Sequence, residues 1–341
     1  MLNTVYRLVE PRRIESEFSN IDVNGDSVLV RPTHLSICNA DQRYFQGTRP
    51  PEVLKKKLPM ALIHEAIGEV IYDPAGDFES GQKVVMVPNT PMEEDDIVAE
   101  NYLRSSKFRA SGFDGFMQDI VAMRRDRVVA VPDGIDDYVA AFTELVSVSY
   151  HAIDRFDRKA HGRRNVLGVW GDGNLAFITS LLLKKRFPES KVYIFGKHEY
   201  KMDDFVFADE TYFIDAIPED LRIDHGFECV GKAGSGTSIN QIIDYINPEG
   251  CIAALGVSED PVPINTRMIL EKGLTLYGSS RSSADDFRHL LQFYKEHPEV
   301  VDYLSSIIGE IVEVSTIKYM THAFDADIQK HGGKTVMVWK K

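Results

Sequence analysis

The chain has 341 residues, of which 43% are hydrophobic and 27% are charged, and its formal net charge is −13. This length favours two domains or one large domain, and the apolar content is sufficient for packed cores. The acidic balance argues against nucleic acid or an anionic membrane surface as a partner. The sequence contains no apolar run of membrane-spanning length and no signal-peptide core, so we expect no membrane insertion.

The first part of the chain is punctuated by Gly and Pro and predicts short strands. A turn at Asn24–Asp26 precedes a strand over Ser27–Pro32, which we expect to end at the proline. Residues 89–111 read as an irregular loop. The spacing of apolar residues then changes to that of a helix, which predicts a single helix over Asp137–Ile153.

From Asn165 onward, apolar runs of strand length alternate with helical segments. This alternation predicts an α/β fold with a doubly wound parallel Rossmann sheet. The expected strands are 166–170, 191–195, 212–215, 225–231, 250–257 and 273–279. A last strand, Lys334–Lys340, is expected to return to the β-rich first part.

The first strand of this region is followed by a glycine pattern, G-x-G-x-x-A, formed by Gly171, Gly173 and Ala176. The first glycine permits a tight turn, the second permits close approach of a pyrophosphate, and the small Ala176 permits close helix packing. The free N–H groups at the helix start, from Asn174 and Leu175, would bind the phosphates. A plain strand–helix turn also requires glycine, so the pattern alone leaves both interpretations open.

The second strand of such a sheet ends where the adenosine ribose binds. Here the strand is followed by Gly196 and Lys197, without an acidic residue at its end. A lysine attracts a 2′-phosphate that a carboxylate would repel, so we predict NADP(H). The alternative is that Lys197 covers a solvated loop.

Cys38, His64 and Glu65 offer a thiolate, an imidazole and a carboxylate, which are the usual donors of a catalytic zinc site. Glu144 is a fourth candidate donor, an acid in an otherwise apolar helical segment, where a carboxylate must be exposed, paired or metal-bound. Each residue also has an ordinary interpretation, because a small buried cysteine or a satisfied core histidine is common. The three cysteines, which include Cys229 and Cys251, are too widely spaced for a disulfide framework, so we expect a reducing, cytoplasmic compartment.

These segments together resemble the zinc-dependent medium-chain dehydrogenase/reductase superfamily, along nearly the whole chain. The resemblance implies a β-rich GroES-like catalytic domain over residues 1–140 and 308–341 and a Rossmann domain over residues 141–307. The matching segments occur in the order of the superfamily: Cys38–Asp41 (C-x-x-D), Ile63–Gly68 (the G-H-E-x-x-G segment), Gly81–Val84, Gly115–Pro132, Glu144 and Gly171–Ala176.

Within the superfamily the chain resembles most the bacterial ribulose-5-phosphate reductases. This resemblance implies NADPH and zinc as cofactors, with Cys38, His64, Glu65 and Glu144 as metal ligands and the first three as catalytic residues. It implies production of ribitol 5-phosphate for wall teichoic acid, a homo-oligomer (dimer or tetramer), and a ribitol-5-phosphate cytidylyltransferase as functional partner.

The chain departs from the superfamily at three places. Residues 89–111 lack the clustered cysteines of a structural zinc lobe, so we predict one zinc ion per subunit. Ala40 stands where many relatives carry a proton-relaying Ser or Thr, so a proton must pass through water, Glu65 or a substrate hydroxyl. Ile63 replaces the glycine before the ligand histidine, which narrows the space there.

A phosphorylated substrate requires cations, and arginine suits phosphate geometry best. We expect Arg43 or Arg49, in a basic loop, or Arg281, after the last strand of the sheet, to bind the phosphate. A second basic cluster is Arg104, Lys107 and Arg109. Exposed basic residues on a solvated loop are the alternative interpretation. Two other functions stay open: a dehydrogenase of an unphosphorylated polyol or alcohol, and a non-catalytic nucleotide sensor with a degenerate metal site.

Overall fold

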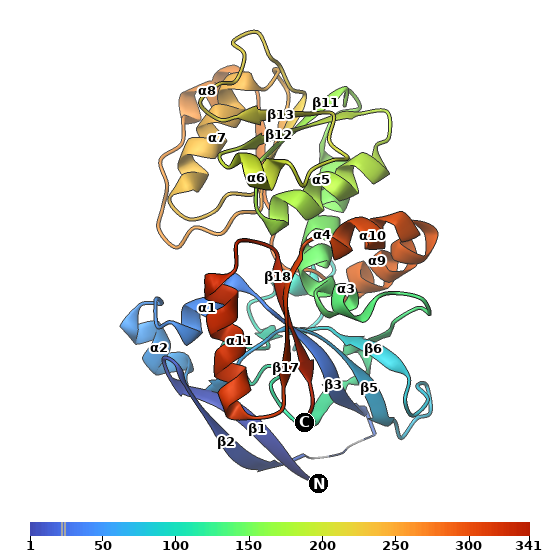
Figure 1. Ribbon diagram of the computed structural model, residues 1–341. Coiled ribbons are helices and arrows are strands. Elements are labelled where there is room, and N and C mark those ends of the chain that lie inside the picture. The colour runs from blue at the N-terminus through green and yellow to red at the C-terminus, as the bar shows by residue number, and fades with distance from the viewer. Residues whose placement is uncertain (22, 24) are drawn as a thin grey trace. The chain divides into compact units, whose positions relative to one another are not determined.

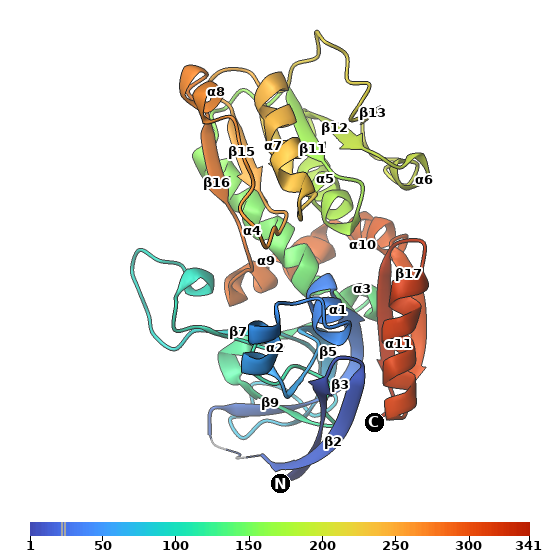
Figure 2. The same ribbon diagram turned by 90° about the vertical axis from the view of Figure 1, so that its left-hand side faces the viewer.

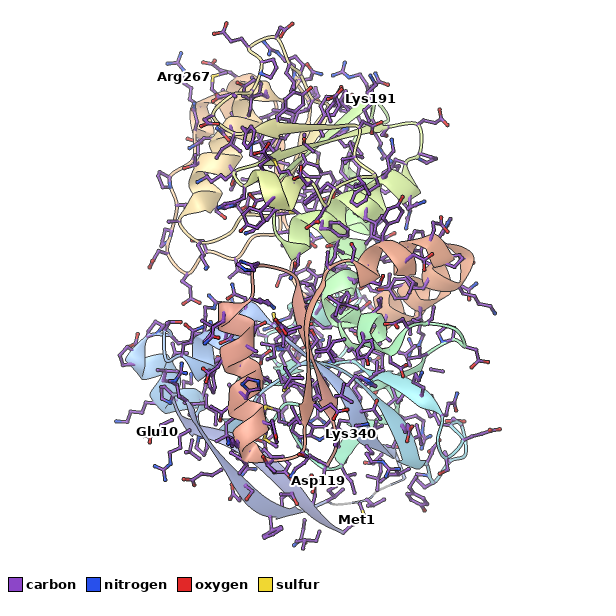
Figure 3. The ribbon with its side chains drawn as sticks, in the orientation of Figure 1. Met1, Glu10, Asp119, Lys191, Arg267 and Lys340 are labelled. Carbon is purple, nitrogen blue, oxygen red and sulfur yellow. The ribbon has the colours of Figure 1, made fainter. Side chains whose placement is uncertain are left out.

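A computed structural model describes residues 1–21, 23 and 25–341 of the chain. The described residues divide into two compact units, one comprising Met1–Ser147 and Ser282–Lys341 and the other Val148–Arg281. The domain boundaries expected from the sequence, after residues 140 and 307, stay a prediction. Asp119 and Lys340 mark the first unit in Figure 3, and Lys191 and Arg267 mark the second.

The first unit is built around a mainly antiparallel sheet with the strand order β10-β6-β5-β3-β18-β17, in which β9 also pairs with β3. A smaller sheet has the order β2-β1-β4, and β7 pairs with β8. The strands are β1 (Leu2–Glu10), β2 (Arg13–Asn20), β3 (Ser27–Ile37), β4 (Met60–Ala61), β5 (Glu65–Tyr72), β6 (Lys83–Met86), β7 (Asn89–Thr90), β8 (Lys107–Phe108), β9 (Val121–Arg124), β10 (Val128–Ala130), β17 (Ile308–Val314) and β18 (Lys334–Trp339).

The helices of the first unit are α1 (Asn39–Phe45), α2 (Pro51–Lys57), α3 (Asp137–Ala141), α9 (Ala284–Glu296), α10 (Pro298–Ser305) and α11 (Ile317–Gln329). Helix α11 runs beside the ribbon formed by β17 and β18 (Figure 1). Strand β18 pairs with β3, as expected for a carboxyl-terminal strand that returns to the β-rich part. Its Trp339 is buried and donates its indole N–H to the carbonyl of Gln118.

Two local expectations are wrong. Strand β3 does not end at Pro32. Its pairing with β5 shifts register between Pro32 and His34, and this irregularity accommodates a proline that has no N–H to donate, so the pairing continues beyond it. The expected helix over residues 137–153 is interrupted at Phe142 (φ −106°, ψ 24°), which separates α3 from α4 (Thr143–Lys159). The turn expected at Asn24 begins at a residue outside the described ones.

The second unit is a parallel sheet with the order β13-β12-β11-β14-β15-β16, the doubly wound arrangement expected from the sequence. Its strands are β11 (Val166–Trp170), β12 (Lys191–Gly196), β13 (Glu210–Phe213), β14 (His225–Glu228), β15 (Cys251–Ala254) and β16 (Thr275–Gly278). Its helices, apart from the end of α4, are α5 (Asn174–Arg186), α6 (Glu199–Met202), α7 (Gly234–Tyr245) and α8 (Thr266–Glu271), drawn beside the sheet in Figure 2. Among the described residues, no helix is both long and apolar enough to cross a membrane.

Candidate functional site

The first unit contains a cluster of potential metal ligands that comes from two paired strands. Cys38 directly follows β3, and Glu65 begins β5, where it pairs with Ser36 of β3. This pairing brings Cys38, His64 and Glu65 together, with one potential ligand atom of each lying within 4.8 Å of the others. The sequence-predicted donors therefore form one cluster.

Asp41 connects the two segments that carry these ligands. It is fully buried, and its Oδ1 accepts the Ile63 N–H at 2.9 Å. Its Oδ2 accepts the Cys38 N–H at 3.3 Å and lies 3.4 Å from Nδ1 of His64. A carboxylate at one ring nitrogen fixes the tautomer and leaves the other, Nε2, for a metal. Asp41 therefore has the position of an outer-shell residue, a role the C-x-x-D spacing alone did not reveal.

The backbone just before His64 adopts an unusual conformation. Ile63 has a φ of +72°, in the left-handed region that glycine prefers and a β-branched residue avoids. The strained conformation is held by the Asp41 hydrogen bond and by the N–H of Phe116, which donates to the Ile63 carbonyl at 2.7 Å. Gly115 lies so close that a Cβ there would come within 2.3 Å of the Ile63 carbonyl oxygen. The Ile-for-Gly departure thus coincides with backbone strain next to a proposed ligand.

Two further buried ionisable residues, Glu144 and Lys334, lie beside the ligand cluster. Glu144, near the start of α4, places its Oε2 4.0 Å from Nε2 of His64. Burial and the nearby Glu65 charge raise the pKa of Glu144 to about 7, although His64 opposes this shift. Lys334 of β18 lies with its Nζ 2.7 Å from Oε2 of Glu65 and donates to the carbonyl of Ile37.

The donor set fits a divalent metal ion. Neither carboxylate oxygen of Glu65 receives a hydrogen bond of normal geometry, although both are buried and Lys334 forms an ion pair with one of them. Burial lowers the pKa of His64, but the negative charges of Asp41 and Cys38 outweigh burial and raise it well above its usual value. A buried site that attracts positive charge and offers S, N and O donors is suited to zinc.

The second unit contains a cavity of about 260 Å³ at the glycine turn. Gly171 has a φ of +133°, which side chains rarely adopt, and a Cβ there would make tight contacts of 3.2 Å with Ala176 and the Cys229 backbone. At Gly173 a Cβ would meet nothing within 4 Å, which leaves open space for a ligand beside the start of α5. This arrangement suits a pyrophosphate.

Most sequence-predicted cofactor residues line this cavity, namely Gly171, Gly173, Gly196 and Lys197. Asn174, Leu175 and Ala176 belong to the first turn of α5 but are not among the lining residues. Sequence reasoning missed much of the wall, including Asp172, His198 and Gln241. Trp170 is buried in the wall, stacks on Phe195 and donates its indole N–H to Gln241.

The candidate phosphate-binding arginines are divided between the two units, with Arg43 and Arg49 in the first and Arg281 in the second. Arg43 lies on α1, and the Arg49 guanidinium lies 4.6 Å from the centre of the Tyr44 ring. Arg281 is the last residue of the second unit and has a φ of +58°. Arg109, from the second basic cluster, has its guanidinium bonded to the carbonyls of Asp114 and Ala122, and burial lowers its pKa to about 10. The Arg109 guanidinium is therefore hydrogen-bonded to backbone carbonyls of its own unit.

Two family descriptions match the chain in its two halves. Residues 24–133 match the alcohol dehydrogenase GroES-like domain, and residues 196–296 match the zinc-binding dehydrogenase family. Together with full-length similarity to curated enzymes, these matches show that the chain belongs to the zinc-dependent medium-chain dehydrogenase/reductase superfamily.

Its relatives narrow this class further. The ribulose-5-phosphate reductase of Bacillus spizizenii is 57% identical over 340 residues, which cover 100% of both chains. The ribulose-5-phosphate reductase 1 of Staphylococcus aureus is 56% identical, with 99% of each chain covered. The crystal structure of S. aureus TarJ in complex with NADPH is similar with a TM-score of 0.90 and 51% identity, and covers 100% of both chains.

Proposed function

We propose that this chain is an NADPH-dependent reductase that converts D-ribulose 5-phosphate to D-ribitol 5-phosphate with one zinc ion per subunit. The observation that carries this proposal is the 57% identity, over the whole length of both chains, with a ribulose-5-phosphate reductase. The donor cluster and the nucleotide cavity supply the two parts such a reaction needs. The product would feed the synthesis of ribitol-phosphate wall teichoic acid.

When bound, zinc supplies Lewis-acid polarisation of a carbonyl oxygen, and NADPH supplies a hydride. Cys38, His64 and Glu65 would hold the ion, and Glu144 is the fourth candidate ligand. Asp41 keeps the Nδ1 side of His64 occupied, which presents Nε2 to the ligand cluster. The open space at Gly173 would admit the pyrophosphate of NADPH.

The new alkoxide must receive a proton from a group other than the side chain at position 40. Ala40 has no hydroxyl, so the relay that many relatives use is missing. We assign the proton to water, to Glu65 or to a hydroxyl of the substrate. We assign the substrate phosphate to Arg43, Arg49 or Arg281.

The setting of the enzyme is also part of the proposal. We propose that the chain forms a homo-oligomer and works in the cytoplasm, where its three free cysteines would stay reduced. We propose further that a ribitol-5-phosphate cytidylyltransferase consumes its product.

The test compares NADPH oxidation with D-ribulose 5-phosphate and with D-ribulose, before and after zinc removal by a chelator. We expect a much higher kcat/KM for the phosphorylated ketose, loss of activity after chelation, and recovery when zinc is returned. Equal kcat/KM values for the two ketoses would refute a phosphorylated ketose as the specific substrate. Activity that is unchanged in protein shown to contain no zinc would refute the metal-dependent reaction.

A further inference from the structure

Helix α2 ends in three consecutive lysines, and the last of them differs from the other two. Lys55 and Lys56 are exposed, whereas Lys57 is partly buried. Its Nζ donates to Oγ of Ser111 at 2.8 Å and lies 6.0 Å from the centre of the Tyr44 ring. Among the described residues, no carboxylate forms an ion pair with Lys57. A charge that is partly removed from water normally has a counter-charge, so this ammonium indicates a site for an anion.

Lys57 and Ser111 together present hydrogen-bond donors to such an anion. An ammonium has three N–H donors, of which Ser111 accepts one, and a serine hydroxyl that accepts a bond keeps its own proton for donation. The neighbouring Tyr44 is only 1% exposed, so its ring is a fixed surface. The Arg49 guanidinium lies 4.6 Å from the centre of the same ring. Two cations beside one buried ring suit a doubly charged group such as a phosphate monoester.

This site lies in the same unit as the ligand cluster, and two short chains of contacts join them. In the first, the Ser111 N–H donates to the carbonyl of Phe108 at 3.2 Å, and the ring centre of Phe108 lies 5.4 Å from that of His64. In the second, Tyr44 follows Asp41 by three residues on α1, so the two side chains share a helix face. Oδ2 of Asp41 lies 3.4 Å from Nδ1 of His64. The site therefore lies near the ligand cluster without belonging to it.

We propose that Lys57 and Ser111 bind the phosphate of the substrate and that Arg49 is the arginine of the same site. This inference rests on the proposed function and deepens it, because it selects one of the three candidate arginines and adds two residues. In D-ribulose 5-phosphate the reacting carbonyl and the phosphate stand at separate positions, joined by a short carbon chain. The ligand cluster and the Lys57–Ser111 pair provide two such positions. D-Ribulose has a hydroxyl in place of the phosphate, so it would lose the charge-assisted contacts.

The first experiment measures kcat/KM of the full-length, zinc-loaded protein for D-ribulose 5-phosphate and for D-ribulose, at saturating NADPH. Lys57→Met removes the charge and keeps most of the length of the side chain. The ratio of the two kcat/KM values should fall about 10- to 100-fold, because the lost contacts are made only to the charged group. The matched controls, Lys55→Met and Lys56→Met, remove the exposed neighbours and should leave the ratio within about twofold. Retained NADPH binding shows that the variants are folded.

Two further variants separate phosphate binding from a purely structural role. Lys57→Arg keeps the charge and should recover part of the ratio that Lys57→Met loses. Ser111→Ala removes a single donor and should lower the ratio by a smaller factor, and an unchanged ratio would exclude Ser111 from the site. An unchanged ratio in Lys57→Met, or equal losses for the two ketoses, would overturn the inference and leave the proposed function in place. A wild type that reduces both ketoses with equal kcat/KM would instead overturn the proposed function itself.

Discussion

The left-handed backbone at Ile63 leads to a prediction in which glycine is better tolerated than alanine. Ile63 is fully buried, so truncation to Ala removes packing worth about 2–5 kcal/mol. Ile63→Ala also keeps a side chain at φ +72°, where an L-residue costs about 1–2 kcal/mol. Ile63→Gly removes a similar amount of packing, and the greater flexibility of glycine in the unfolded chain costs about a further 0.5–1 kcal/mol of stability. Glycine, however, relieves the backbone strain. Both variants should be less stable than the wild type.

The decisive quantity is therefore the difference between the two variants. We expect Ile63→Gly to be more stable than Ile63→Ala by up to about 1 kcal/mol, because strain relief exceeds the entropic cost. Scanning calorimetry of the zinc-loaded protein should show this as a melting temperature higher by up to about 2–4 °C for a unit of 150–250 residues.

Ile67 supplies the control, because it is equally buried and lies in β5 without the positive φ of Ile63. At Ile67 the usual order should hold, with the Ala variant more stable than the Gly variant by about 0.5–1 kcal/mol. If Ile63→Ala melts at or above Ile63→Gly, position 63 is not strained and the argument fails.

Three further predictions concern the metal site and a buried histidine. Asp41→Asn should lower zinc affinity about 10- to 100-fold in competition with a chelating dye, because it removes the charge facing His64; unchanged affinity would exclude the outer-shell role. Cys38→Ala should abolish ketose reduction and leave NADPH affinity nearly unchanged in a fluorescence titration, because the nucleotide cavity is lined by other residues; retained activity would exclude Cys38 as a catalytic ligand. Burial and the neighbouring His161 lower the pKa of His225 to about 4. The folded protein therefore holds His225 neutral, and this contributes about 3 kcal/mol to the free energy of unfolding above pH 6.5. The contribution is lost as the pH falls from 6.5 toward 4. Calorimetry across this pH range should show a steeper loss for the wild type than for His225→Asn, and parallel curves would contradict the assignment.

Features encoded by neighbouring residues were predictable from the sequence. The strands of the parallel sheet alternate along the chain with helical segments, so the presence and parallel type of β11–β16 followed from local pattern. Features that depend on pairing were not. The extension of β3 past Pro32 requires a register shift relative to β5, and a register shift leaves no mark in the sequence of β3 alone.

The candidate site shows the same division. The identities of Cys38, His64 and Glu65 suggested a metal, because their side chains have the right donor atoms. The partners that orient or neutralise these residues come from distant segments, as with Lys334 of the last strand beside Glu65. Likewise, the bond between Asp172 and His198 joins two loops that only the pairing of β11 with β12 brings together.

The placement of the two tryptophans has a practical consequence. Trp170 lies in the wall of the nucleotide cavity, and Trp339 is buried in β18 of the other unit. The chain contains no other tryptophan, so each unit carries its own intrinsic fluorophore. Trp170→Phe and Trp339→Phe would therefore yield single-fluorophore proteins whose emission reports the unfolding of one unit at a time. In the Trp339→Phe protein, energy transfer from Trp170 to the reduced nicotinamide would also report cofactor occupancy directly.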